Sequence, residues 1–185
     1  MASVGLLGDR HELEALFDEL AAELHRLETS AEIVMVGGSW MLWHAKRLAT
    51  RDVDSARRFA TDLSQAIARV GARHELSPHW LNDNAAAYWP TGASYDECEL
   101  VYERGPLRVR TPSADIMFVM KLCRASPQDR EDMISLWPFC TFTTAEDAVQ
   151  AFRGSYPNES DDEYLADYVG EIVTAANRAA HSAEQ

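Results

Sequence analysis

Two aspartates separated by a single residue, Asp52 and Asp54, form the pair with the clearest chemical potential in the sequence. Residues 52–55 are expected to form a strand, in which residues i and i+2 point to the same face. Both carboxylates should therefore project together, with Val53 buried behind them. Two negative charges this close repel each other unless a positive charge lies between them. Because Mg²⁺ is typically held by one or two carboxylates together with substrate phosphates, the pair predicts a site for Mg²⁺ or Mn²⁺.

A glycine turn precedes the aspartate pair in the chain. Gly37 and Gly38 follow the apolar run 33–36, and Ser39 comes directly after them. Backbone N–H groups at such a turn and at a helix N-terminus bind phosphate well, and a serine adds a hydroxyl. One half of this stretch could therefore hold a triphosphate and the other half its metal ions. The alternative interpretation is an ordinary surface turn followed by an isolated acidic pair.

Hydrophobic periodicity predicts the elements that would position these residues. Leucines at helical spacing favour a helix over 9–27, for which Asp9 is a suitable N-cap with Glu12 three residues later. Ser126 and Pro127 predict the start of another helix. Further helices are expected over 39–46, 57–70, 114–124, 144–152 and 161–178, strands over 32–36, 52–55, 97–102 and 107–110, and a short helix or loop over 76–82.

The order of these elements indicates the fold class. A strand, a turn, a helix and a second strand, followed by mixed elements, favour an α/β (α+β) fold with a mixed sheet flanked by helices. A chain of 185 residues has the size of one domain. We expect an α/β core over 1–125 and a helical C-terminal extension over 126–185 that packs on the core as one compact unit.

The composition limits the classes of function. The net charge of −13 argues against general nucleic-acid binding, although a local basic cleft could still receive a nucleotide or an RNA end. The apolar runs are too short to cross a membrane, and the N-terminus lacks the pattern of a signal peptide. With three cysteines and no CxxC pair, the sequence predicts neither a disulfide framework nor a zinc knuckle, and a cytoplasmic setting is expected.

The longer stretch VMVGGSWMLWHAKRLATRDVDSA resembles the first motif of the nucleotidyltransferase superfamily, which consists of a strand, a GG or GS turn, a short helix and DxD. Its second half is similar to the toxin–antitoxin-associated branch, which includes AbiEii-like and MenT-like enzymes and the DUF6036 group. Two later segments, SPHWLND and SADIMFVMKLCRASPQDREDMISL, are similar to further motifs of that group. The resemblance covers about 32–136 and implies a nucleotidyltransferase-like fold.

The resemblance also implies which residues bind the nucleotide. The glycine–serine turn would hold the phosphates. Two residues of the segment before the aspartates would also contact the nucleotide. The nucleotide-binding residues implied in this way are Gly37, Gly38, Ser39, Arg47 and Thr50.

The catalytic residues implied by the resemblance are acidic, with one lysine. Asp52 and Asp54 match the metal-binding pair. Lys121 matches a lysine that meets the nucleotide, and it is one of only two lysines in the chain, which fits a requirement for a compact ammonium group. Asp129 and Asp132 match two further acids. One of these two should complete the acidic cluster, and we prefer Asp132.

Together these patterns predict a metal-dependent nucleotidyltransferase that moves a nucleotide from an NTP to an RNA (tRNA) or a protein acceptor. The resemblance implies a role in a toxin–antitoxin system, with a cognate toxin or antitoxin as partner. The alternative is a catalytically silent binding module, such as an antitoxin-like protein whose acidic surface suits a basic partner. A weaker alternative, a metal phosphatase or nuclease, leaves the glycine turn unexplained. The donor base, the acceptor and the oligomeric state stay open, although the tail helices and tryptophans would allow a homodimer.

Overall fold

The computed structural model describes residues 6–44, 48–160 and 162–183. They group into two compact units. The first comprises the described residues up to Ala87 together with Tyr95–Pro112, and the second comprises Tyr88–Ser94 and the described residues from Ser113 onward. The helix over 114–124 thus belongs to the second unit, whereas the sequence predicted a boundary after it, at 125/126. The reason is that its Phe118 packs against Trp137 and Phe142 of the second unit.

Within the described residues, five strands of the first unit form one mixed sheet with the order β3-β2-β1-β5-β4. The strands are β1 (Ala31–Val36), β2 (Val53–Ser55), β3 (Leu81–Asn82), β4 (Glu99–Arg104) and β5 (Leu107–Thr111). β1 pairs antiparallel with β2 and parallel with β5. β2 and β3 are parallel, and β4 and β5 form an antiparallel hairpin. This mixed sheet with flanking helices confirms the predicted α/β (α+β) class.

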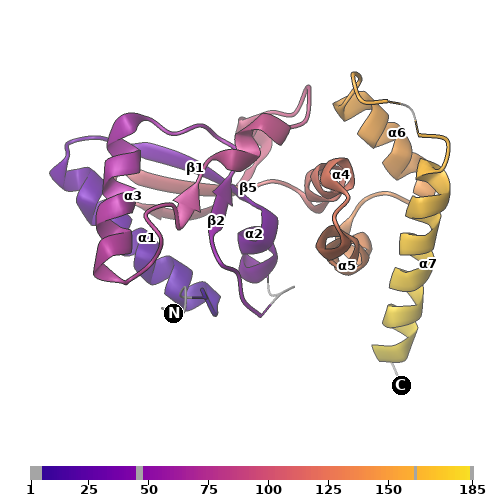
Figure 1. Ribbon diagram of the computed structural model, residues 1–185, viewed down its shortest axis with the longest axis horizontal. Coiled ribbons are helices and arrows are strands. Elements are labelled where there is room, and N and C mark those ends of the chain that lie inside the picture. Colours follow the sequence, from indigo (N-terminus) through magenta and orange to yellow (C-terminus); the bar gives the residue numbers. More distant parts are fainter. Residues whose placement is uncertain (1–5, 45–47, 161, 184–185) are drawn as a thin grey trace. The chain divides into compact units, whose positions relative to one another are not determined.

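The hydrophobic core of the first unit lies between one face of the sheet and two helices. These helices, α1 (Arg10–Arg26) and α3 (Thr61–Arg73), lie side by side in Figure 1. Alternation along the strands directs Ile33 and Met35 of β1 into this core. Asp9 caps α1 by accepting a hydrogen bond from the Glu12 N–H, as the sequence predicted. A shorter helix, α2 (Gly37–Trp43), follows β1 without any intervening residue.

The second unit is helical (Figure 1). Its helices are α4 (Ala114–Arg124), α5 (Pro127–Leu136), α6 (Ala145–Ser155) and α7 (Leu165–Ala183). α4 packs on α5 and α6, and both of these contact α7. Ser126 and Asp129 form a capping box at the start of α5, with Pro127 in its first turn, which confirms the predicted helix start.

Several predicted elements have other bounds or another type in the structure. α3 begins at Thr61 rather than at residue 57, because the chain before it is irregular and the Phe59 N–H donates to the Asp83 carboxylate. The segment 76–82 ends in a strand, because Leu81 and Asn82 pair with β2. Short 3₁₀ helices also occur at Asn84–Tyr88, Tyr95–Glu97 and Trp137–Phe139. Among the described residues, none of the helices combines the length and apolar character needed to cross a membrane.

Candidate active site

The glycine turn and the second aspartate meet at the end of β1. β1 and β2 pair so that Val36 lies opposite Asp54, and Gly37 is the next residue along the chain. Gly37 has a φ of +67°, and a Cβ atom added to it would lie 2.7 Å from Asp54 Oδ2. Both the left-handed backbone and the lack of room require glycine at this position. The structure therefore brings the two halves of the predicted motif against each other.

The other residues of the motif surround the start of β2. β2 begins at Val53, so Asp54 lies within the strand and Asp52 directly precedes it. Val53 is fully buried, whereas both aspartates are half-buried, as expected if the carboxylates project away from the core. Thr50 is buried, and its Oγ1 donates to the carbonyl oxygen of Asp52 at 3.1 Å. This bond fixes the backbone directly before β2. Arg47 lies outside the described residues.

Two side chains of α2 form hydrogen bonds that fix the first turn of this helix. Ser39 is fully buried, and its hydroxyl donates to the carbonyl oxygen of Val36 at 2.8 Å. This bond ties the turn that contains Gly38 to the end of β1. Trp40 is also buried, and its Nε1 donates to the carbonyl oxygen of Pro112 at 2.9 Å. The Ser39 hydroxyl thus stabilises the turn, and its contact with a nucleotide phosphate stays a prediction.

A polar residue that the sequence interpretation missed lies beside Asp54. Asn82 of β3 pairs in register with Asp54 and is buried. Its Oδ1 accepts a hydrogen bond from the Asn84 N–H at 3.1 Å. The signal that could have revealed it is the SPHWLND segment. In this segment Trp80 is buried and donates from Nε1 to the carbonyl oxygen of Ile67 at 3.0 Å, which fixes the start of β3.

Lys121 lies in a buried cluster of charges in the second unit. Its Nζ donates to Asp132 Oδ2 at 2.6 Å and lies 3.3 Å from Asp129 Oδ1. Arg124 donates to both carboxylate oxygens of Asp129 at 2.8 Å. The side chains of Lys121, Asp129 and Asp132 are all buried. The structure thus brings the predicted residues together as two groups: one at β1 and β2 in the first unit, and one at α4 and α5 in the second.

Both carboxylate oxygens of Asp129 accept hydrogen bonds within the second group. Burial would raise the pKa of this carboxyl, but hydrogen bonds from Arg124 and Ser126, with the charges of Lys121 and Arg124, lower the pKa to about 2. The same carboxylate completes the capping box of α5. Its contacts therefore give Asp129 a clear function in folding, whereas the catalytic contribution of Asp129 or Asp132 stays a prediction.

The lowered pKa of Asp129 predicts a specific loss of stability in acid. A carboxyl whose folded pKa is about 2, against 3.8 when unfolded, stabilises the fold above pH 4 and loses this contribution as the pH falls toward 2. Between pH 5 and pH 2, the wild type should lose about 2 kcal/mol more of its unfolding free energy than Asp129→Asn does. Urea unfolding at the two pH values measures this difference, and equal losses in both proteins would contradict the assignment.

Asp52 and Asp54 are the residues suited to hold a metal ion. No group of three His, Cys, Asp or Glu side chains arranged for a metal occurs in the part of the chain that the structure describes. Two carboxylates suit Mg²⁺, which takes its remaining ligands from water and substrate phosphates. Glycine at position 37 avoids a Cβ atom that would lie 2.7 Å from Asp54 Oδ2, so the space beside this oxygen is compatible with the predicted ion.

Comparison with known protein families decides the assignment. Residues 11–137 match the model of a family described as a nucleotidyltransferase of unknown function, DUF6036. The chain belongs to the DUF6036 family. The matched range includes both groups of predicted residues, and the match confirms the predicted nucleotidyltransferase family. No curated protein and no solved structure matches this DUF6036 chain.

Proposed function

We propose that this DUF6036 protein is a Mg²⁺- or Mn²⁺-dependent nucleotidyltransferase that transfers a nucleotide from an NTP to a hydroxyl group of an RNA, such as tRNA, or of a protein. The observation that carries the proposal is the approach of Gly37 to Asp54, where an added Cβ would lie 2.7 Å from the carboxylate. A structural turn requires glycine for its backbone conformation, but it has no need of a carboxylate against it.

In the proposed reaction the aspartates bind the metal ion and the glycine turn binds the phosphates. Asp52 and Asp54 would hold a divalent ion, which when bound would lower the pKa of the acceptor hydroxyl and neutralise charge on the leaving group. Gly37 and Gly38 leave the turn bare, so that phosphate oxygens can approach its backbone N–H groups. The acceptor hydroxyl loses its proton to water as its oxygen bonds to the α-phosphorus of the NTP. The bond from that phosphorus to the bridging oxygen then breaks, and pyrophosphate leaves.

Lys121 and Asp132 enter the proposal through the family resemblance. Lys121 would steady the phosphates, and Asp132 would position the metal or the acceptor. The 2.6 Å hydrogen bond between them supports a coupled role, in which Asp132 orients the ammonium group. The resemblance to the toxin–antitoxin branch supports tRNA or a protein as the acceptor and a cognate toxin or antitoxin as the partner.

The substitution Gly37→Ala tests the contact that carries the proposal. A methyl group at this position would both strain the positive-φ backbone and displace the Asp54 carboxylate. We expect a stability loss of about 1–2 kcal/mol and a fall in transfer rate of at least about tenfold. Gly105→Ala is the matched control, because Gly105 also has positive φ, at +52°, but has open space around its Cβ position. Thermal unfolding and transfer assays of both variants separate strain from site geometry, and equal transfer rates would contradict the proposal.

The experiment that tests the function uses each α-labelled NTP in turn with Mg²⁺ or Mn²⁺ and either total tRNA or cell lysate. Label should move into RNA or protein with the wild type and stay in the NTP with the Asp52→Ala/Asp54→Ala variant. The labelled product identifies the donor base and the acceptor class together. If no NTP supports transfer and calorimetry detects no metal-dependent NTP binding, the silent binding module replaces this proposal.

A further inference from the structure

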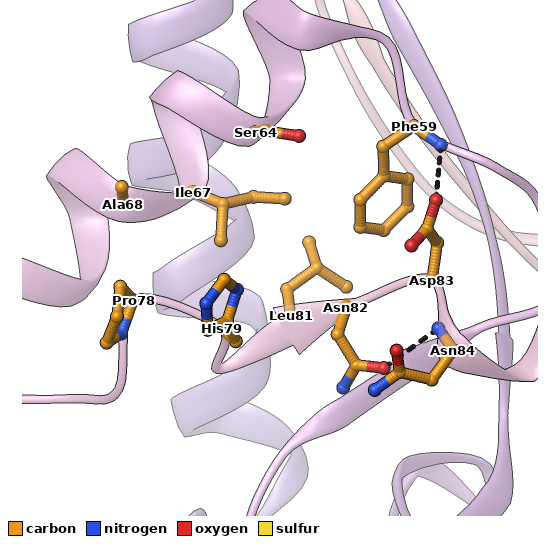
Figure 2. A pocket seen from close by; sticks show the side chains of 10 residues that line it. All are labelled: Phe59, Ser64, Ile67, Ala68, Pro78, His79, Leu81, Asn82, Asp83 and Asn84. Carbon is orange, nitrogen blue, oxygen red and sulfur yellow. Dashed lines mark hydrogen bonds between the residues drawn. The ribbon is translucent and has the colours of Figure 1, made fainter.

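The first unit contains a cavity of about 530 Å³ between α3 and the segment 78–84, which includes β3. Ile67 and Leu81 form an apolar floor (Figure 2). In the same view the rings of Phe59 and His79 lie on either side of Leu81, and the carboxamide of Asn84 lies below Phe59. A pocket of this volume has the size of a site for a small organic molecule. Its walls combine flat rings with groups that form hydrogen bonds.

Hydrogen bonds fix the walls of the cavity in place. The Phe59 N–H donates to Asp83 Oδ2 at 2.9 Å, which joins the connection before α3 to the end of β3. The Asn84 N–H donates to Asn82 Oδ1 at 3.1 Å. Because the donors are the backbone N–H groups of Phe59 and Asn84, these bonds order the wall without using the Asn84 carboxamide. A preformed pocket costs a ligand less in ordering of the protein.

The charges around the cavity limit what can enter it. Among the described residues that line it, Asp83 and His79 are the ionisable ones, and none is a lysine or an arginine. A phosphate or a carboxylate would therefore find no fixed positive charge and would face the Asp83 carboxylate. A neutral, planar group that stacks on rings and bonds to an amide is a better match. Nucleobases are recognised in this way, by aromatic stacking together with hydrogen bonds to their edges.

The cavity adjoins the candidate active site through the sheet. Asn82, which lines it, pairs in register with Asp54 on the neighbouring strand. Adjacent strands lie about 4.8 Å apart, so the cavity begins one strand away from the aspartate pair. We propose that this cavity binds a nucleobase, either that of the donor NTP or an unpaired base of an RNA acceptor. The role of the bound base rests on the proposed nucleotidyl transfer, whereas the binding itself does not.

The test titrates the full chain with adenosine, cytidine, guanosine and uridine in the presence of EDTA, followed by ¹H–¹⁵N NMR. At least one nucleoside should produce saturable shifts at Phe59 and Asn84. Ala68→Phe, which places a ring in the cavity from α3, should remove them, whereas Gln65→Phe, on the exposed surface of the same helix, should not. Asn84→Ala, which removes only an exposed carboxamide, should weaken binding by about fivefold. No shift with any nucleoside, or shifts that persist in Ala68→Phe, would overturn the proposal.

Two further measurements show whether the bound base comes from the donor or the acceptor. They also test nucleobase binding independently of nucleotidyl transfer. The Asp52→Ala/Asp54→Ala variant should bind nucleosides as the wild type does, even though it should not transfer nucleotides. In the transfer assay, a higher KM of Ala68→Phe for the NTP assigns the base to the donor. A higher KM for the RNA assigns it to the acceptor. Both results support the pocket, and unchanged KM values for both substrates contradict it.

Discussion

Replacing Asp54 with asparagine is expected to lower the rate of nucleotidyl transfer at least about a hundredfold and to leave the fold intact. Removal of residues that merely support metal ligands typically costs ten- to a hundredfold, so loss of a ligand charge should cost at least as much. Asp54 lies within β2, is half-buried, and has its carboxylate against the Gly37 turn. Asparagine keeps the shape of the side chain and removes its negative charge. Steady-state kcat/KM and thermal unfolding measure the two effects separately.

A matched control for this variant is Asp62→Asn. Asp62 is an exposed acid in the first turn of α3, in the same unit as Asp54. Asp62→Asn changes the net charge by the same amount as Asp54→Asn, so any general electrostatic effect on substrate binding appears in both variants. Transfer by Asp62→Asn should stay within about twofold of the wild type, because surface substitutions away from such sites have small effects. Equal activity of the two variants would remove Asp54 from the catalytic site.

The second large effect is expected in stability. Lys121→Met should lower the free energy of unfolding by about 3–5 kcal/mol, because it leaves the Asp132 carboxylate buried without its 2.6 Å hydrogen bond from Nζ. Glu146→Met is the control in the same unit. Glu146 is exposed and lies 3.9 Å from Arg153 in an ion pair, and exposed pairs of this kind contribute at most about 1 kcal/mol. Urea unfolding of both variants gives the comparison, and equal losses would show that the buried cluster contributes no more than a surface pair.

If Lys121→Met fails to fold, a double substitution still tests the contribution of the buried pair to stability. Lys121→Met/Asp132→Leu replaces the buried pair by apolar side chains and should recover most of the lost stability. Its transfer activity then separates two roles for the pair. Recovery of stability without recovery of activity indicates that Lys121, Asp132 or both act in the reaction, as the family resemblance implies. Recovery of both would assign the pair to folding alone.

Local signals in the sequence predicted most of the fold. Asp9 and Ser126 satisfy backbone N–H groups of their own helices. Glu12 three residues after Asp9, and Pro127 directly after Ser126, were therefore enough to locate two helix starts. β3 was not predicted, since Leu81 and Asn82 become a strand only by pairing with β2, far away in the sequence. A strand of two residues is also too short to show alternation.

The candidate site was predicted unevenly for a similar reason. Gly37, Asp52 and Asp54 belong to one continuous motif, so a resemblance to known enzymes could identify them together. The mutual pairing of Lys121 with Asp129 and Asp132 depends on the turn between α4 and α5. That turn passes through Ala125 with φ of +47°, where glycine or asparagine is the usual signal. Without that signal, the sequence did not show that the lysine and the two acids contact one another.

The measurement that tests the central claim most directly compares an NTP labelled at the α-phosphate with the same NTP labelled at the γ-phosphate. Both are incubated with the wild-type chain, Mg²⁺ or Mn²⁺ and total tRNA or lysate, beside the Asp52→Ala/Asp54→Ala variant. Nucleotidyl transfer predicts α-label in the acceptor and γ-label in pyrophosphate, with neither product formed by the variant. Movement of the γ-label into the acceptor, or its release as inorganic phosphate while the acceptor stays unlabelled, would contradict the account.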